Sequence, residues 1–424
     1  MNCSGGLKLY QSAVLHIRAL VRAWPTSPNI VSKHLSLLKG GKRLRAVGVL
    51  MPHLHKALLL CAMLKCTFTK FNMKKIIGIF LLFIATCSLG QSQQKIIDSL
   101  FYGQKGIKIK FPDVGLVVGI YKDGIVNYYS LGTRFKNGTE RLDSASIFEI
   151  GSATKTFTAL LLANQILNKR VDRNDYIDKY LSSKITLPPA LKHKIKLTDL
   201  ASHQSGLPNL SNDKYFTDLL NKDSRNPFRF VDKKYLINVL KETDTLDNYG
   251  HYQYNNYAFS LLGYILERNS KLEYASLIKK NILIPLNMNQ TSFTIPNSRN
   301  VAGLYNQQGE PQEYLILKSV NPAGGLKSNA VDLIKYLKAY ILPNKFDKAI
   351  QLTQHVFYED KNRKDGLGWD KKSDYYQKDG DTFGNSCLMR YSKSKKIAIV
   401  VLSNHQNGQL VSDAVDFIYD RLNN

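Results

Sequence analysis

Ser152 and Lys155 stand three residues apart at the start of an apolar, helix-like run, in the segment FEIGSATKTFT at 148–158. On a helix, positions i and i+3 lie on one face, so the hydroxyl and the amine can come within hydrogen-bond reach. An unprotonated amine placed there can take the proton that a hydroxyl must lose before it attacks a carbonyl. The pair therefore predicts that Ser152 is a nucleophile that becomes acylated. The same spacing occurs six times in the chain, so other residues must support the assignment.

Two later segments carry residues that suit such a reaction. Tyr254 and Asn256 lie two residues apart where a loop enters an amphipathic helix pattern. There a phenol can shuttle a proton and an amide can hold a carbonyl, although a tyrosine-rich packing loop is the alternative. Lys378 and Gly380 precede a strand pattern, where a lysine can attract an anion and a glycine lets a substrate approach the backbone. Alone, this segment is equally typical of a surface turn.

In this order, the three segments resemble the motifs of the serine β-lactamase and penicillin-binding-protein superfamily. The S-x-x-K, Y-x-N and K-T-G signatures of that family fall on Ser152/Lys155, Tyr254/Asn256 and Lys378/Gly380. The chain is most similar to the class C β-lactamases and their D-alanyl-D-alanine carboxypeptidase and esterase relatives. LASHQSGLP at 200–208 and PAGGL at 322–326 match further landmarks, and the resemblance covers residue 112 to the C-terminus.

The resemblance implies a role for each motif residue. Ser152 would form the acyl-enzyme, and Lys155 and Tyr254 would transfer protons. Asn256 would position the substrate, and Lys378 would attract an anionic group or tune Tyr254. The backbone amides of Ser152 and Asp381, beside Gly380, would form the oxyanion hole. No metal and no organic cofactor is implied, and His203 is expected to be structural rather than catalytic.

Two acidic residues depart from the family pattern. Asp379 replaces the hydroxyl residue of K-T-G, and Asp381 stands where small residues are usual. Two carboxylates beside Gly380 should weaken the binding of anionic β-lactams and peptide C-termini. We therefore predict a hydrolase that cleaves amide or ester bonds, with peptidoglycan-type D-amino-acid peptides or related amides and esters as substrates. A class C-type β-lactamase is the alternative. A protein of another class, one that binds or senses penicillin or cell-wall material without hydrolysis, also stays open.

The chemistry requires elements that bring these distant segments together. Residues 116–121 and 125–129 flank an Asp-Gly turn and predict a β-hairpin. Residues 386–391 and 397–402 predict a second hairpin, and 409–422 a closing helix. Short helical patterns fill the middle of the chain, and the helix after Ser152, with Leu160 to Leu162, Ile166 and Leu167, is expected in the interior. We predict an α+β fold of the β-lactamase/transpeptidase type, an antiparallel sheet from both chain ends flanked by helices, with an inserted, mostly helical region.

The N-terminal part of the chain predicts export. Met73-Lys74-Lys75, an apolar run at 76–85 and small residues up to Gly90 have the pattern of a signal peptide at 73–90. Residues 1–72 carry eleven Lys and Arg and no Asp or Glu, and are interpreted as an untranslated or non-native extension. The mature chain would have a lead-in at 91–111 and a hydrolase domain at 112–424. It would act in the periplasm of a bacterium or be secreted, with no stable membrane span after cleavage.

The charge and cysteine content of the chain restrict the kinds of partner that it can have. The formal net charge is +26, but residues 1–72 supply eleven of these charges and the rest are dispersed without a basic stripe. A nucleic-acid or membrane-surface protein is therefore disfavoured. Four of the five cysteines fall before residue 91, which leaves Cys387 and no intrachain disulfide or cysteine-based metal site in the mature chain. The expected partner is a small-molecule or peptide substrate, including cell-wall fragments, and the sequence does not indicate the oligomeric state.

Overall fold

A computed structural model describes residues 93–100, 115–210, 214–295 and 300–423. The predicted extension at 1–72, the predicted signal peptide and most of the predicted lead-in lie outside the described residues. Residues 93–100 of the lead-in form a helix. Among the described residues, no helix has the length and apolar character needed to cross a membrane.

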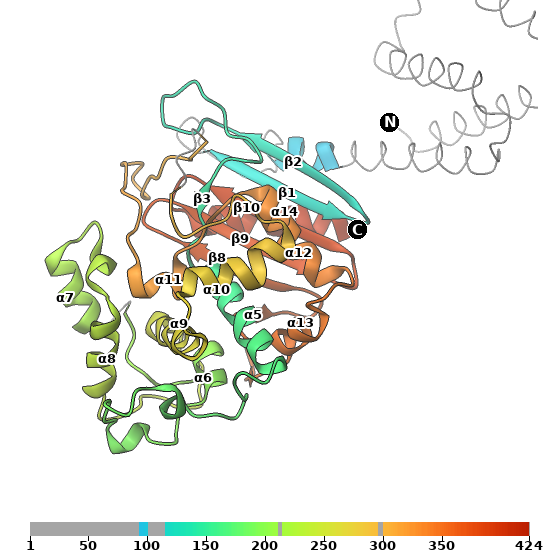
Figure 1. The fold of residues 1–424 in the computed structure, drawn as a ribbon. Helices are drawn as coiled ribbons and strands as arrows, with labels where there is room; N and C mark the ends of the chain where they lie inside the picture. Colours follow the sequence, from blue (N-terminus) through green and yellow to red (C-terminus); the bar gives the residue numbers. More distant parts are fainter. Residues whose placement is uncertain (1–92, 101–114, 211–213, 296–299, 424) are drawn as a thin grey trace, which may run out of the picture. The chain divides into compact units, whose positions relative to one another are not determined.

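An antiparallel sheet of eight strands, in the order β2-β1-β10-β9-β8-β7-β6-β5, organises the described part of the chain (Figure 1). Its strands are β1 (Leu116–Lys122), β2 (Ile125–Leu131), β5 (Tyr358–Glu359), β6 (Lys364–Asp365), β7 (Asp370–Lys371), β8 (Tyr376–Asp381), β9 (Ser386–Ser392) and β10 (Ile397–Ser403). The two-stranded pair β3 (Phe148–Glu149) and β4 (Lys327–Ser328) lies apart from this sheet. The N-terminal hairpin pairs with β10 near the C-terminus, so the prediction of a sheet built from both chain ends is confirmed.

Both predicted hairpins are present. In the first, Asp123 and Gly124 have φ angles of +48° and +94°. A two-residue turn with two positive φ angles matches the twist of the flanking strands, and Asp-Gly adopts it readily. In the second, β9 and β10 pair over their full length, from Ser386↔Ser403 to Ser392↔Ile397. These hairpins were predictable because their turns and their pairing are local.

The strands alternate between two buried layers, one on each face of the sheet. Ile397, Ile399 and Val401 of β10 pack with the C-terminal helix α14 (Gly408–Asn423). The residues between them, Ala398 and Val400, join the larger cluster on the other face. Period-two alternation with both faces covered explains why β10 is buried throughout and reads as one continuous apolar run.

The helices between β2 and β5 include the predicted insertion and carry much of the site, and the helix Ala330–Ile341 packs against β1, β9 and β10 (Figure 1). They are α5 (Thr154–Leu167), α6 (Leu197–Ala201), α7 (Lys214–Lys222), α8 (Lys233–Lys241), α9 (Asn256–Ser270), α10 (Tyr274–Ile278), α11 (Asn321–Gly324), α12 (Ala330–Ile341) and α13 (Asp347–Gln354). The α5 helix is buried from Thr154 to Ala163. Its last residue, Leu167, is 44% exposed, so the prediction of an interior position is wrong there, because the helix ends at the surface.

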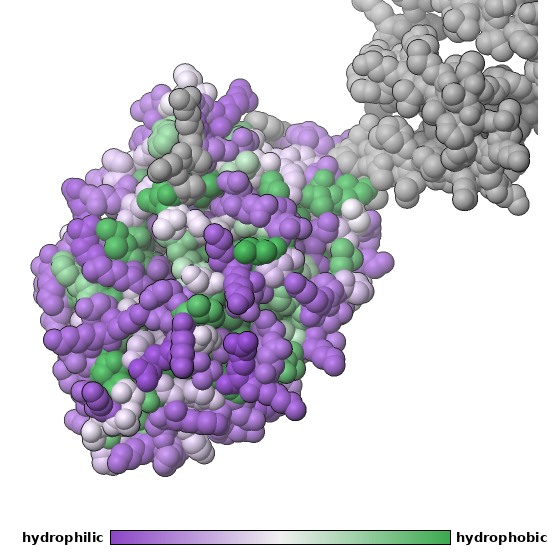
Figure 2. All heavy atoms as spheres, in the orientation of Figure 1, coloured by the Kyte–Doolittle hydropathy of each residue, from purple (hydrophilic) through white to green (hydrophobic). Residues whose placement is uncertain are grey.

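Hydrophobic residues form small, separate patches among hydrophilic ones on the face that Figure 2 shows. The two buried clusters take up most of the large apolar side chains of the sheet and of α5, α9 and α12. Isolated exposed apolar residues are ordinary on a folded protein.

Candidate active site

Ser152 lies in a single turn of 3₁₀ helix that runs directly into α5. The turn η2 (Gly151–Ala153) joins β3 to α5, and Gly151 has a φ of +48°. A Cβ on Gly151 would lie 2.6 Å from the carbonyl oxygen of Asp381, and a Cβ on Gly380 would lie 2.8 Å from the Ser152 nitrogen. Glycine is therefore required on both sides of this contact. The contact places the end of β8 against the turn that holds Ser152.

Three oxygen atoms surround the side-chain nitrogen of Lys155. Its Nζ lies 2.9 Å from Ser152 Oγ, 2.7 Å from Asn256 Oδ1 and 2.7 Å from the Ala323 carbonyl oxygen. The Lys155 side chain is completely buried. Burial first, and then the charge of Lys378, hold the Lys155 pKa well below its usual value. The neutral form of the amine is therefore favoured far more than in a solvent-exposed lysine.

Lys155 Nζ is placed to donate to all three oxygens as an ammonium, whereas the neutral amine, the form that can act as a base, has only two N–H groups. The Asn256 and Ala323 oxygens accept hydrogen bonds only, so they take the two N–H groups of a neutral amine. The remaining lone pair of Lys155 then faces Ser152 Oγ, whose hydroxyl can donate. Tyr254 OH is also hydrogen-bonded to Ser152 Oγ. With the serine proton directed at Lys155, the phenol donates to the serine, and the three side chains form one proton-transfer chain.

Tyr254 is held by the residues around it. Asn255 caps α9 by accepting the Ala258 N–H at 2.8 Å, which fixes the end of the preceding loop. The Asn255 N–H donates to His203 Nδ1 at 3.0 Å, and the His203 ring lies 4.6 Å from the Tyr254 ring. Burial first, and then nearby positive charge such as that of Lys378, hold the His203 pKa well below its usual value, so the imidazole is neutral. Through these contacts His203 holds the Tyr254 ring and the neighbouring backbone in position. Burial also raises the Tyr254 pKa, against the opposing charge of Lys378.

Lys378 provides the positive charge next to this chain. Its Nζ lies 5.2 Å from the centre of the Tyr254 ring and donates to Asp379 Oδ1 at 3.1 Å. Burial lowers the Lys378 pKa, but the carboxylates of Asp370 and Asp379 outweigh burial and raise it above its usual value. The charged form is therefore favoured at Lys378 and the neutral form at Lys155, although both side chains are buried.

The two acids beside Gly380 have different partners. The Asp379 side chain is 57% exposed and pairs with Lys378. The Asp381 carboxylate accepts a hydrogen bond from the Ser386 hydroxyl and lies against Gly408. Asp379 is thus the neighbour that partly neutralises Lys378, in line with the expected cost to anionic substrates. Asp381 contributes its backbone to the contact with Gly151.

Two hollows meet at Ser152, and both include Ser152 and Asp381 in their walls. The apolar hollow has a volume of about 200 Å³. Most of its other wall residues are apolar, and the full set is Gly151, Phe216, Phe228, Asn256, Leu315, Leu317, Val320, Ala323, Gly324, Thr382, Phe383 and Gln406. The charged hollow has a volume of about 460 Å³. Its other walls are Tyr252, Tyr254, Arg363, Asp370, Lys378 and Asp379. The environments on the two sides of the serine therefore differ sharply in polarity.

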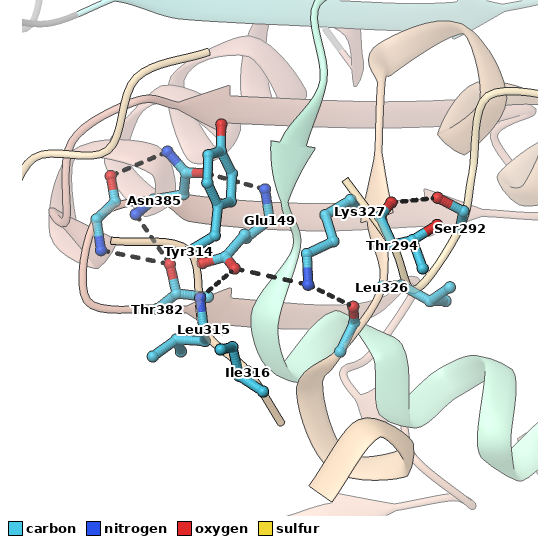
Figure 3. A network of polar contacts seen from close by, with 12 residues as sticks. Glu149, Ser292, Thr294, Tyr314, Leu315, Ile316, Leu326, Lys327, Thr382 and Asn385 are labelled. Carbon is cyan, nitrogen blue, oxygen red and sulfur yellow. Dashed lines mark hydrogen bonds and ion pairs between the residues drawn. The ribbon is translucent and has the colours of Figure 1, made fainter. Parts of the chain in front are cut away.

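Glu149 and Lys327 form a buried ion pair beside the turn that holds Ser152 (Figure 3). Glu149 and Lys327 are 3% and 4% exposed, and their nearest charged atoms are 3.7 Å apart. Glu149 Oε1 also accepts the Leu315 N–H at 2.9 Å, and the Asn385 side chain accepts the Glu149 N–H at 2.9 Å. These contacts join β3, two residues before the serine turn, to a wall of the apolar hollow and to the β8–β9 turn. Burial raises the Glu149 pKa against the effect of Lys327.

Replacing Lys327 with methionine should destabilise the protein by about 3–5 kcal/mol at pH 8, because a buried carboxylate loses its partner. Urea unfolding of wild type and variant measures this difference. The loss should shrink as the pH falls, since protonation removes the unpaired charge from Glu149. The double variant with Glu149→Gln should recover part of the loss at pH 8. An unchanged unfolding free energy in Lys327→Met would contradict the prediction.

The chain is similar to known proteins over most of its length. The model of the Beta-lactamase family matches residues 110–422. The chain belongs to the beta-lactamase family. A beta-lactamase of Psychrobacter immobilis is 25% identical over 312 residues, which cover 68% of this chain and 70% of that protein. As the family assignment implies, the protein is a serine hydrolase.

Solved structures of beta-lactamase-family proteins share the fold. A class C beta-lactamase from Rhodobacter sphaeroides superposes with a TM-score of 0.66 at 19% identity, covering 78% of this chain and 99% of that one. A beta-lactamase/D-alanine carboxypeptidase from Pseudomonas syringae superposes with a TM-score of 0.65 at 21% identity, covering 80% and 99%. The predicted fold class is therefore confirmed.

The structure of this beta-lactamase-family protein brings the residues singled out in the sequence to one place. Ser152, Lys155, Tyr254 and Asn256 are linked by hydrogen bonds, Lys378 borders them, and Gly380 and Asp381 pack against the serine turn. Among the described residues, no group of three or more His, Cys, Asp or Glu side chains is arranged to hold a metal ion.

Several residues at the site were not singled out in the sequence. The Ala323 carbonyl belongs to the PAGGL segment, which was a landmark without a role. Phe383 follows Gly380 by three residues. Its position just after the Lys378-Asp379-Gly380 segment could have indicated that it lies near the site. Arg363 stacks 3.8 Å from the Tyr252 ring centre and donates to Asp370 Oδ1 at 2.6 Å. Nothing in its local sequence marks Arg363, because its partners come from the fold.

Proposed function

We propose that this beta-lactamase-family protein is an exported hydrolase that cleaves amide or ester bonds through an acyl-enzyme on Ser152. Peptidoglycan-type D-amino-acid peptides or related amides and esters are the proposed substrates. The observation that carries the proposal is the position of Lys155 Nζ, which has two acceptor-only oxygens at 2.7 Å and Ser152 Oγ at 2.9 Å. Export rests on the predicted signal peptide at 73–90.

The reaction follows from the proton-transfer chain. Ser152 Oγ bonds to the substrate carbonyl carbon while its proton passes to Lys155 Nζ. The bond from that carbon to the leaving nitrogen or oxygen then breaks, the leaving atom takes the Tyr254 proton, and the Lys155 proton restores the phenol. Water then adds to the acyl carbon. One proton of this water passes to Ser152 Oγ as the bond from Oγ to the acyl carbon breaks, and the acid departs. The Ser152 and Asp381 backbone N–H groups are the proposed oxyanion donors.

Labelling with a fluorescent fluorophosphonate tests the acyl-enzyme proposal. The wild type should be labelled and should hydrolyse p-nitrophenyl esters, and Ser152→Ala should lose both properties. Ser276→Ala is a matched control, because Ser276 and Lys279 have the same spacing but an exposed position at α10. Equal labelling of wild type and Ser152→Ala would overturn the proposal.

The class C-type β-lactamase is the second candidate, and the name of the Psychrobacter immobilis relative favours it. The charged Lys378 could attract the carboxylate of a β-lactam, but Asp379 partly cancels its field. A hydrolysis panel of nitrocefin, D-Ala-D-Ala peptides, D-amino-acid amides and short esters separates the two. A dominant nitrocefin rate would favour the β-lactamase. Ser152-dependent labelling without turnover would favour a non-hydrolytic cell-wall binding or sensing protein.

A further inference from the structure

The two hollows beside Ser152 are not equivalent in the reaction. The leaving atom needs a proton, and Tyr254 is the hydrogen-bonded phenol that can supply it. Tyr254 lines the charged hollow but not the apolar one. A leaving group that receives its proton from Tyr254 therefore departs on the charged side. The acyl group, which remains on Ser152, must extend to the other side.

Three phenylalanines build the apolar hollow on that side. They come from separate parts of the chain: Phe216 from α7, Phe228 from the turn η5 (Pro227–Phe230) and Phe383 from the connection between β8 and β9. The ring centres of Phe216 and Phe228 are 5.6 Å apart, and those of Phe228 and Phe383 are 6.5 Å apart. These separations are typical of aromatic rings in contact. All three rings are only half-buried, so a ligand can reach them.

We infer that the apolar hollow selects substrates whose acyl group carries a large apolar, preferably aromatic, substituent. This inference rests on the proposed function, since it concerns the acyl group transferred to Ser152. A volume of about 200 Å³ accommodates a substituent of the size of one aromatic ring. Leu315, Leu317 and Val320 complete walls that offer such a ring dispersion contacts and exclude water. A methyl substituent would leave most of these contacts unmade.

Two esters with the same leaving group isolate this preference. For wild type, kcat/KM should be about tenfold or more higher with 4-nitrophenyl phenylacetate than with 4-nitrophenyl acetate, after division by the ratio of their spontaneous hydrolysis rates. Phe228→Ala should bring this corrected ratio down about tenfold, mainly through the phenylacetate. Phe230→Ala is the matched control, because Phe230 belongs to the same turn but is 41% exposed and lies outside the hollow.

Phe383→Ala repeats the test from another element, should Phe228→Ala fail to fold. Fluorophosphonate labelling of each protein is measured in parallel. A corrected ratio near one in labelled wild type would overturn the inference and leave the hydrolase proposal standing, as would an unchanged ratio in folded Phe228→Ala and Phe383→Ala. Loss of Ser152-dependent labelling would overturn both proposals.

Discussion

Replacing Lys155 with methionine should lower the acylation rate about 10²- to 10⁴-fold, because Ser152 loses the base that takes its proton. Methionine has nearly the length of lysine and no charge, so it should fill the buried space without an uncompensated ion. The Asn256 and Ala323 oxygens, which accept from Lys155 in the wild type, then lose their donor. Single-turnover labelling by a fluorophosphonate measures the rate, and thermal melting checks that the variant is folded. A variant that is labelled as fast as the wild type would exclude Lys155 as the base.

The pH profile tests the same residue by another route. Only neutral Lys155 accepts a proton, so the rate should rise with pH through the Lys155 pKa and level off above it. Because burial and Lys378 hold this pKa well below the usual value, the rise should be complete well before pH 10.5. Lys378→Met removes a positive neighbour, which should raise the Lys155 pKa and move the rise to higher pH. Asp379→Asn removes a negative neighbour and should move it to lower pH. A rise that stays in place in both variants would show that another group is titrating.

Replacing Gly380 with alanine should lower kcat about 10²- to 10³-fold, the effect of losing one oxyanion donor. The new Cβ would lie 2.1 Å from the Ile150 carbonyl oxygen and 2.8 Å from the Ser152 nitrogen. Both are backbone atoms, so the overlap can be relieved only by moving β8 away from the serine turn. That movement separates the Ser152 and Asp381 amides, which are the proposed donors.

Steady-state kinetics with one ester, together with melting curves, measure the effect of Gly380→Ala. Gly124→Ala in the β1–β2 turn is the control, because its Cβ would have no atom within 4 Å. That variant should lose some stability, since φ is +94° there, but keep the kcat of the wild type. A Gly380→Ala enzyme with full kcat would argue against a donor at residue 381.

Much of the fold could be predicted because its signals are local. The Asp-Gly turn at 123–124 and the alternating strands at both ends of the chain determine their own pairing partners across short turns. The S-x-x-K spacing likewise reflects geometry within one helical turn, and the Y-x-N spacing reflects the loop that leads into α9. The short strands β5, β6 and β7 were not predicted, because two residues carry no periodicity and their pairing depends on neighbouring strands.

The position of Ser152 shows the limit of this local information. The sequence pattern placed Ser152 at the start of a helix, and it lies in the 3₁₀ turn that leads into α5, but the close approach of Gly151 and Gly380 that shapes this turn was not evident. These glycines are 229 positions apart in the sequence. Only a folded chain brings such segments into contact, so the shape of the turn could not be read from residues 148–158.

The residue types at the site were evident from the chain alone, but their charge states came from the tertiary structure. Lys155 and Lys378 look alike as letters, and both are buried. Burial and the nearby charge of Lys378 lower the Lys155 pKa and favour its neutral form, whereas Asp370 and Asp379 keep Lys378 charged. The convergence of Phe216, Phe228 and Phe383 beside Ser152 is also a result of folding. Reaction type therefore follows from local spacing, and selectivity follows from long-range packing, because burial and charge at one residue depend on neighbours that are distant in the sequence.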